Sequence, residues 1–78
     1  MSKSRKMSES EMQYIVLRLL ERAKQASDKS KRDRTDMLQA GRSLAYYEMM
    51  DILKSELIVS DQDLKKYGLE IDLEKELV

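Results

Sequence analysis

Apolar residues recur every three or four positions along two long stretches of this chain, which is the spacing of one face of a helix. The first stretch follows Ser8, and its apolar stripe consists of Met12, Ile15, Val16, Leu19, Leu20 and Ala23. The second follows Thr35, and its stripe consists of Met37, Leu38, Leu44, Ala45, Met49, Ile52, Leu53 and Leu57. This pattern predicts helices at residues 8–27 and 35–59 that pack together as an antiparallel hairpin.

Signals for helix ends flank both stretches. Ser8 and Glu11 form a capping box, in which each side chain accepts a hydrogen bond from the backbone N–H of the other residue. The charged run 27–34 (SDKSKRDR) has two interpretations, a loop or a solvated part of a longer helix. The loop is favoured because Ser and Asp side chains compete for backbone hydrogen bonds. Thr35 or Asp33 would then cap the second helix.

The remaining residues predict a short helix and a tail. Ser60 and Asp63 repeat the capping pattern, so a helix is expected over residues 61–66. Gly68 supplies the left-handed conformation that commonly ends a helix, and Leu69 would pack back against it. The tail that follows first alternates apolar and acidic residues and then spaces two leucines four apart, so it is a last helical turn or an extended arm.

A further set of apolar and small residues widens the two stripes. Tyr46 and Tyr47 are adjacent, and successive helical residues point about 100° apart, so one ring should leave the hairpin's own core. Gly41 is either a tolerated helical glycine or a place where a neighbouring helix approaches closely. We therefore expect two copies to pair into a four-helix bundle. The predicted interface residues are Tyr14, Leu17, Gly41, Tyr46, Tyr47 and Met50.

Composition supports an all-α fold and narrows the chemistry. The 78 residues include no Pro, two Gly, and no Cys or His. The lack of Cys excludes disulfides and thiolate chemistry, and the lack of His removes the commonest zinc ligand and general base. One domain is expected over residues 8–78, after a disordered basic N-terminus at residues 1–7. A core this small is marginal by itself, which again favours association.

Charge is balanced overall, with 15 basic and 15 acidic residues, but it is unevenly distributed. The basic residues are concentrated in the first half of the chain, and the tail is acidic. Two basic clusters are candidates for contact with nucleic acid, because phosphate binding needs such a patch. The first consists of Lys3, Arg5 and Lys6, and the second of Lys29, Lys31, Arg32 and Arg34. No glycine turn of helix-turn-helix type accompanies them, so the alternative is that both are solvated charge runs.

Two carboxylates one helical turn apart, Glu48 and Asp51, are a candidate site for a hard cation such as Mg²⁺. The all-α nucleotide pyrophosphohydrolases of the MazG type carry an E-x-x-E motif on one helix and an E-x-x-D motif on the next. Residues 48–51 (EMMD) resemble the second motif, and this resemblance would imply a Mg²⁺-dependent hydrolase. The first predicted helix has no matching acidic pair, since Glu21 is followed three residues later by Lys24.

Glu48 also has structural interpretations. It falls close to the apolar stripe of the second helix, where an unpaired buried carboxylate would be costly. It either points to solvent or forms an ion pair across the helices, and a paired Arg and Glu can fix the register of two helices. The candidate partners are Arg18, Arg22 and Arg42.

These features favour a small non-enzymatic protein-interaction module that acts as an adaptor, a regulator or a structural subunit. No cofactor is expected. The expected partners are a second copy of the chain and an unidentified protein. Nucleic acid is a less favoured partner, and a membrane is not expected because no stretch approaches about 20 apolar residues. The polar N-terminus lacks the apolar core of a secretion signal, which predicts a cytoplasmic location. The chain also resembles many small helical proteins of bacteria.

Overall fold

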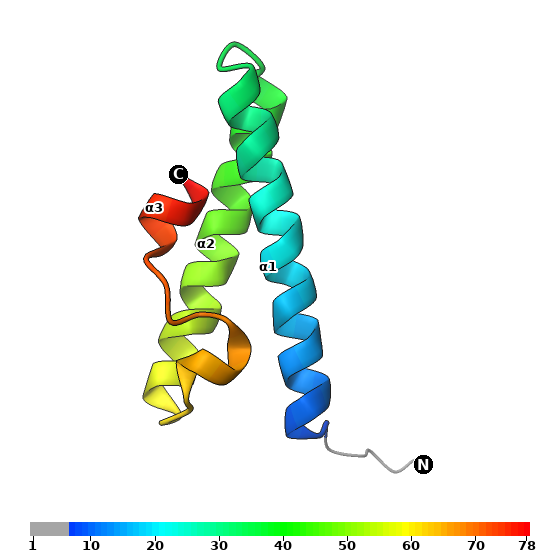
Figure 1. Cartoon of the computed structure of the whole chain (residues 1–78). Coiled ribbons are helices and arrows are strands. Elements are labelled where there is room, and N and C mark those ends of the chain that lie inside the picture. Colours follow the sequence, from blue (N-terminus) through cyan, green and yellow to red (C-terminus); the bar gives the residue numbers. More distant parts are fainter. Residues whose placement is uncertain (1–6) are drawn as a thin grey trace, which may run out of the picture.

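The structure, a computed structural model, describes residues 7–78 and consists of two long helices followed by two short ones (Figure 1). Helix α1 spans Glu9–Arg32, α2 spans Met37–Val59, the 3₁₀ helix η1 spans Leu64–Tyr67 and α3 spans Leu73–Leu77. No strand occurs among the described residues. The all-α fold, the antiparallel hairpin and a short C-terminal helix are therefore confirmed. Apart from Met7, the N-terminal segment predicted to be disordered lies outside the described residues.

Helix α1 begins at the predicted capping box. The hydroxyl of Ser8 accepts a hydrogen bond from the backbone N–H of Glu11 at 3.1 Å. The Glu11 carboxylate in turn accepts one from the backbone N–H of Ser8 at 2.9 Å. The two bonds satisfy N–H groups that have no partner inside the helix.

The prediction of a loop over residues 27–34 is wrong, because α1 continues through most of this run to Arg32. Ala26 and Ser27, where the run begins, are 0% and 2% exposed, so this part of α1 packs against the rest of the molecule and is not free to form a solvated loop. The last turn is rich in basic residues, which interact favourably with the negative end of the helix dipole. Burial and charge together outweigh the local preferences of Ser and Asp.

The connection between the long helices is a tight turn. The Asp33 carboxylate accepts hydrogen bonds from the backbone N–H of Thr35 at 3.0 Å and from its hydroxyl at 2.6 Å. These bonds hold the pKa of Asp33 below its ordinary value. The residue that caps α2 is Asp36, rather than Asp33 or Thr35, and its carboxylate accepts a hydrogen bond from the N–H of Gln39.

The short 3₁₀ helix η1 starts later than predicted. Ser60 closes the end of α2 and does not cap the next helix. Asp61 has a positive φ of 59°, which turns the chain away from α2, and Asp63 caps η1 instead. Gly68 ends η1 in the left-handed conformation, as predicted, with a φ of 73°.

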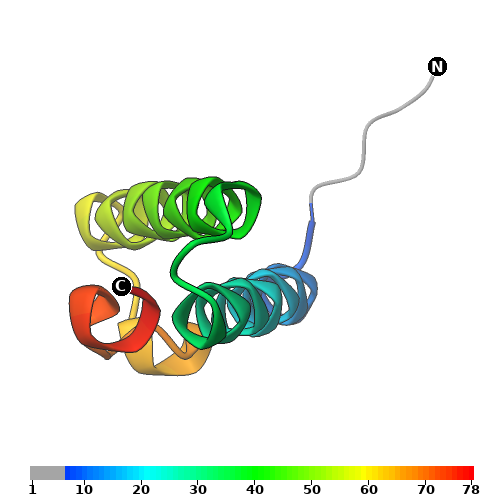
Figure 2. The same ribbon diagram turned by 90° about the horizontal axis from the view of Figure 1, so that it is seen from above.

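The C-terminal segment, defined as residues 61–78, folds back along the hairpin and completes the core (Figure 2). Viewed from above, α1, α2 and this segment form the three corners of a triangle. The tail is a helical turn rather than an extended arm, since Asp72 caps α3 through N–H groups of its first turn. The core draws on all three parts and consists of Val16, Leu20, Ala23, Met50, Leu57, Tyr67, Leu69, Leu73 and Leu77.

Candidate interaction surfaces

Helix α2 carries apolar side chains around its whole circumference, although the rest of the chain covers only part of it. On the core side Met50 is 0% exposed, whereas Ile52 is 61% exposed and Leu38 is 77% exposed. Helices that are apolar on all sides are normally buried on all sides. The exposed side of α2 is therefore a candidate contact surface.

Four of the exposed apolar residues of α2 are spaced seven apart and so share one side of the helix, whereas Met37, Leu44 and Ile58 lie outside this row. This α2 column consists of Leu38, Ala45, Ile52 and Val59, with Met49 beside it. The C-terminal segment lies on the opposite side, because the Lys54 ammonium donates a hydrogen bond to the backbone oxygen of Ile71. Lys54 follows Ala45 by nine residues, or about two and a half helical turns, so the two side chains point in opposite directions from α2.

Helix α1 has a matching apolar stripe. The α1 stripe consists of Met12, Ile15 and Leu19, of which the first two are exposed and the last is half-buried. Val16 points into the core, and Leu17 approaches the C-terminal segment, since its Cδ2 lies 2.7 Å from the position that a Cβ on Gly68 would take. Ile15 lies on the other flank of Val16, about 200° around the helix from Leu17.

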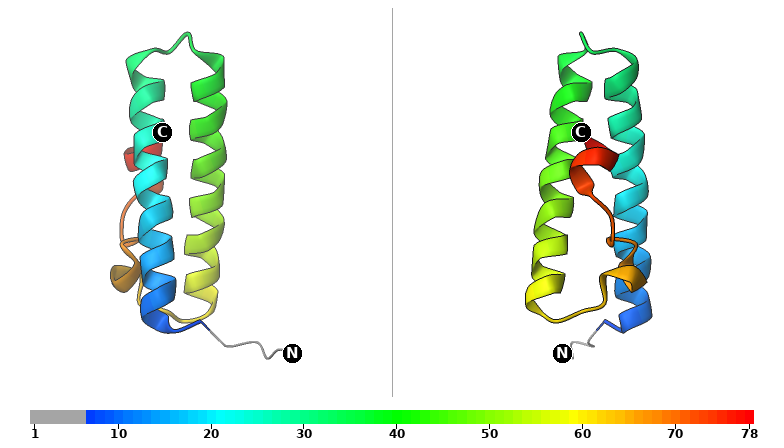
Figure 3. Two further views of the ribbon diagram at one scale, coloured as in Figure 1. Left: turned by 90° about the vertical axis from the view of Figure 1, so that its right-hand side faces the viewer. Right: turned by 60° about the vertical axis from the view of Figure 1, so that its left-hand side comes forward.

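Both sets of residues therefore face away from the C-terminal segment, and together they make one surface that we call the open face. In the left view of Figure 3 the two long helices lie side by side, with most of the C-terminal segment behind α1. With a rise of 1.5 Å per residue, the α2 column is about 30 Å long and the α1 stripe about 10 Å long. With a width of about 10 Å for each helix, the open face has an area of about 400 Å². This area is comparable to the largest apolar patch of a typical monomer, and such a patch is often a functional surface.

Three of the predicted interface residues lie elsewhere than expected. Met50 is fully buried in the core, and Tyr46 and Tyr47 are half-buried and pack against it. The reason is that the C-terminal segment covers this side of α2, which the hairpin alone would leave bare. Conversely, Ile52 and Met49, which the sequence assigns to the hairpin's own stripe, lie on the exposed side.

The close helix approach considered at Gly41 does not occur within the chain. Gly41 is exposed, and no atom lies within 4 Å of the position that a Cβ there would take. Its place on α2, four residues before Ala45, nevertheless puts it beside the α2 column.

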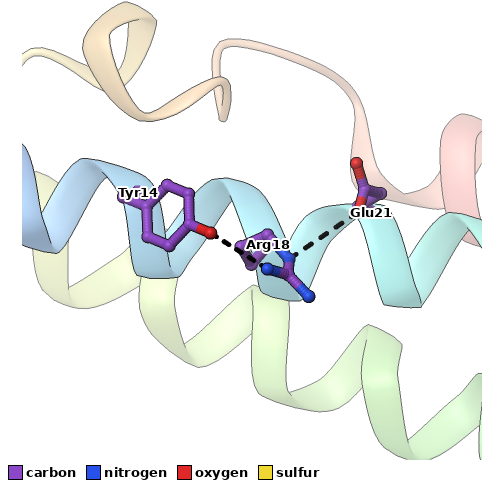
Figure 4. A network of polar contacts seen from close by, with 3 residues as sticks. All are labelled: Tyr14, Arg18 and Glu21. Carbon is purple, nitrogen blue, oxygen red and sulfur yellow. Dashed lines mark hydrogen bonds and ion pairs between the residues drawn. The ribbon is translucent and has the colours of Figure 1, made fainter.

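The other two predicted interface residues lie on α1. Tyr14 is 60% exposed, and its hydroxyl accepts a hydrogen bond from Arg18 at 3.0 Å (Figure 4). This bond raises the pKa of Arg18, as do the charges of Tyr14 and of Glu21, whose carboxylate lies 3.8 Å from the guanidinium. Leu17 is 46% exposed at the edge of the C-terminal segment. Neither residue belongs to the open face.

A second surface feature is a groove of about 780 Å³ between α2 and the C-terminal segment, which we call the acidic groove. Its lining includes Tyr47, Lys54, Ile58 and four carboxylates, Asp51, Glu70, Asp72 and Glu74. Partial burial raises the pKa of Tyr47, and the carboxylates of Glu74, Asp51 and Asp72 add to this effect because they disfavour a phenolate. Lys54 contributes one positive charge to this lining, and its ammonium donates a hydrogen bond to the backbone oxygen of Ile71, so the four carboxylates remain in excess.

The two carboxylates of the candidate metal site have different surroundings. Glu48 and Asp51 are both exposed, and Asp51 lines the acidic groove whereas Glu48 does not. Within residues 7–78 the structure brings together no group of three or more acidic residues that could hold a metal ion. The resemblance to the E-x-x-D motif thus extends to these two carboxylates and gains no third ligand from the fold.

The first basic cluster, Lys3, Arg5 and Lys6, lies outside the described residues. The second basic cluster lies at the tip of the hairpin, at the top of Figure 1. All four of its members are exposed. Lys31 and Arg34 also line a small cavity between the long helices, together with Ser27 and Ser43. Its position next to the last turn of α1 gives the cluster a structural role at the negative end of the helix dipole.

Comparison with known proteins gives no relative: no family model, no curated protein and no solved structure matches this chain. Among the described residues, neither long helix has the sustained apolar stretch that a membrane-spanning helix requires. The functional argument therefore rests on the open face and the acidic groove.

Proposed function

We propose that this protein is a small non-enzymatic protein-interaction module that acts as a homo-oligomer, and we expect it to work in the cytoplasm, as the sequence predicts. Two hairpins pack their open faces together and form a four-helix bundle. The observation that carries the proposal is the open face itself, an apolar surface that runs along α2 and the first half of α1. Pairing would cover the α2 column, the side of α2 that the rest of the chain leaves exposed.

The size of the surface fits this proposal. A standard protein interface buries about 800 Å² on each partner; the open face offers about 400 Å² of apolar surface, and the polar residues that flank it supply the remainder. Its centre is occupied by side chains such as Ile15, Met49 and Ile52, and the desolvation of such groups drives association. The small core of a short chain gains stability from a partner subunit.

The same proposal leaves a surface for a different protein. The acidic groove lies on the side of α2 that carries the C-terminal segment, so pairing of the open faces does not cover it. A dimer would present two such grooves, which is an arrangement suited to an adaptor, a regulator or a structural subunit.

The proposal is tested by changing two isoleucines of α2 that differ in their place. Ile52 lies on the open face and is 61% exposed, and Ile58 borders the acidic groove and is 57% exposed. We expect Ile52→Glu to give a monomer and Ile58→Glu to keep the oligomer, as measured by sedimentation equilibrium with circular dichroism as a control for folding. Equal behaviour of the two variants would rule out the open face as the site of association.

A further inference from the structure

Each residue of α1 has a counterpart in α2 at the same height along the hairpin axis, and we call such residues level with each other. Because the helices run in opposite directions from a short turn, residues whose numbers sum to about 70 lie at the same level. Ser27 and Ser43 fit this relation, since they line the same small cavity. The relation places Arg22 level with Glu48, and it places Ile15 within one helical turn of the level of Ile52.

Two arrangements pair the open faces about a two-fold axis. When the axis runs along the hairpins, both tips point the same way and each α1 packs on the α2 of the other copy. When the axis runs across the hairpins, the tips point in opposite directions, so α1 packs on α1 and α2 on α2. In both arrangements neighbouring helices are antiparallel, so helix packing alone does not choose between them.

Charge distinguishes the two arrangements. On α1, Arg22 and Lys29 follow Ile15 at intervals of seven residues, so this edge of the open face is basic. On α2, Glu48 lies between Ala45 and Ile52 at helical spacing, so this edge is acidic. Like-on-like packing would bring Arg22 toward Arg22 of the partner subunit and Glu48 toward Glu48 of the partner subunit, which is unfavourable.

Packing α1 on the partner's α2 reverses this outcome. Residues at one level then meet across the interface, so Arg22 faces Glu48 of the partner subunit, and symmetry repeats the pair. Within residues 7–78 neither side chain has an ion-pair partner in its own chain, and both are exposed. The apolar parts of the two open faces also meet in this arrangement, because Ile15 lies within one helical turn of Ile52 of the partner subunit.

We propose that the occupant of the open face is a second copy of this chain with its tip pointing the same way, held in register by two reciprocal ion pairs between Arg22 and Glu48. This inference rests on the proposed function and adds the orientation and register of the pair. Ion pairs at the edges of an apolar helix seam commonly select the partner and its orientation.

Cysteine cross-linking tests the orientation, and the absence of natural Cys makes the result specific. We expect a mixture of Ile15→Cys and Ile52→Cys chains, refolded together and oxidised, to form a disulfide-linked dimer. Met49→Cys alone should stay unlinked, because the proposed arrangement keeps the two copies of α2 apart. In the like-on-like arrangement, with Glu48 near Glu48 of the partner subunit, the two copies of this exposed position would lie at nearly the same level. Efficient linking of Met49→Cys to itself would therefore overturn the proposed orientation while leaving the homo-oligomer intact, whereas a monomeric mass for the unmodified chain would overturn both proposals.

Charge reversal tests the register without a need for close cysteine geometry. We expect Arg22→Glu and Glu48→Lys each to weaken dimerisation about tenfold, because each change affects two symmetry-related pairs. The double variant should return to within about threefold of the original dissociation constant, since the pair is restored with reversed sign. Single variants that dimerise as well as the original chain would overturn the Arg22–Glu48 register.

Discussion

Gly68 shows how one residue positions the C-terminal segment. Its φ of 73° disfavours any other residue, and an added Cβ would lie 2.7 Å from Cδ2 of Leu17. We expect Gly68→Ala to lower the free energy of unfolding by about 1–2 kcal/mol, from backbone strain and the displaced leucine. Urea denaturation at a fixed protein concentration measures the change.

Gly41→Ala is the matched control for that variant. Gly41 is helical and has open space where its Cβ would lie, so Ala should raise the free energy of unfolding by about 0.5–1 kcal/mol. Effects of the same sign at both glycines would contradict the conformations described for them.

Tyr47 gives a prediction at alkaline pH. Its pKa is raised above the ordinary 10.0, first by partial burial and then by the carboxylates around the acidic groove. The raised pKa means that neutral Tyr47 contributes stability below pH 10, and this contribution is lost as the pH rises through the folded-state pKa. Absorbance of the tyrosinate should show a late step that Tyr47→Phe removes. Removal of a step at or below pH 10 would contradict the acidic surroundings of this ring.

At the scale of elements, the short helix α3 does more for the fold than its length suggests. Leu77 is 1% exposed in the core, and the next residue, Val78, is 65% exposed. We expect Leu77→Ala to lower the free energy of unfolding by about 2–5 kcal/mol, because it leaves a cavity beside α2. Val78→Ala should change it by less than about 0.5 kcal/mol. A small effect of Leu77→Ala in urea denaturation would show that α3 does not seal the core.

Elements were predictable from sequence where the signal is local. The capping box at Ser8 fixes the start of α1, and the left-handed glycine fixes the end of η1. The charged run before Arg34 was not predictable in this way, because its helix depends on burial of Ser27 by distant parts of the chain. Local preferences are weak compared with such tertiary packing.

The sequence was equally unable to show which side of α2 faces the core and which side forms the candidate contact surface. Periodicity reveals that α2 has apolar residues on several sides, but it does not say which side the C-terminal segment covers. The structure covers Met50 and leaves Ile52 exposed, the reverse of the sequence-based assignment. The seven-residue spacing of Leu38, Ala45, Ile52 and Val59 was the available signal for a contact surface.

At the scale of the whole molecule, the monomer has two unlike sides. One side of the hairpin is sealed by the C-terminal segment and carries the acidic groove, and the other is the open face. A chain of this size gains little stability from its own core, so covering the open face would raise both stability and cooperativity. We therefore expect the midpoint of thermal unfolding to rise with protein concentration, as measured by circular dichroism. A midpoint independent of concentration would mean that folding does not involve a second chain.

The measurement that tests the central claim most directly is the mass of the unmodified chain in solution. Sedimentation equilibrium over a wide range of concentrations should give a mass of twice 9.2 kDa, decreasing toward 9.2 kDa only on strong dilution. This result would support association through the open face and justify the cross-linking experiments. A mass of 9.2 kDa at every concentration would contradict the account, because the open face would then remain uncovered in the working protein.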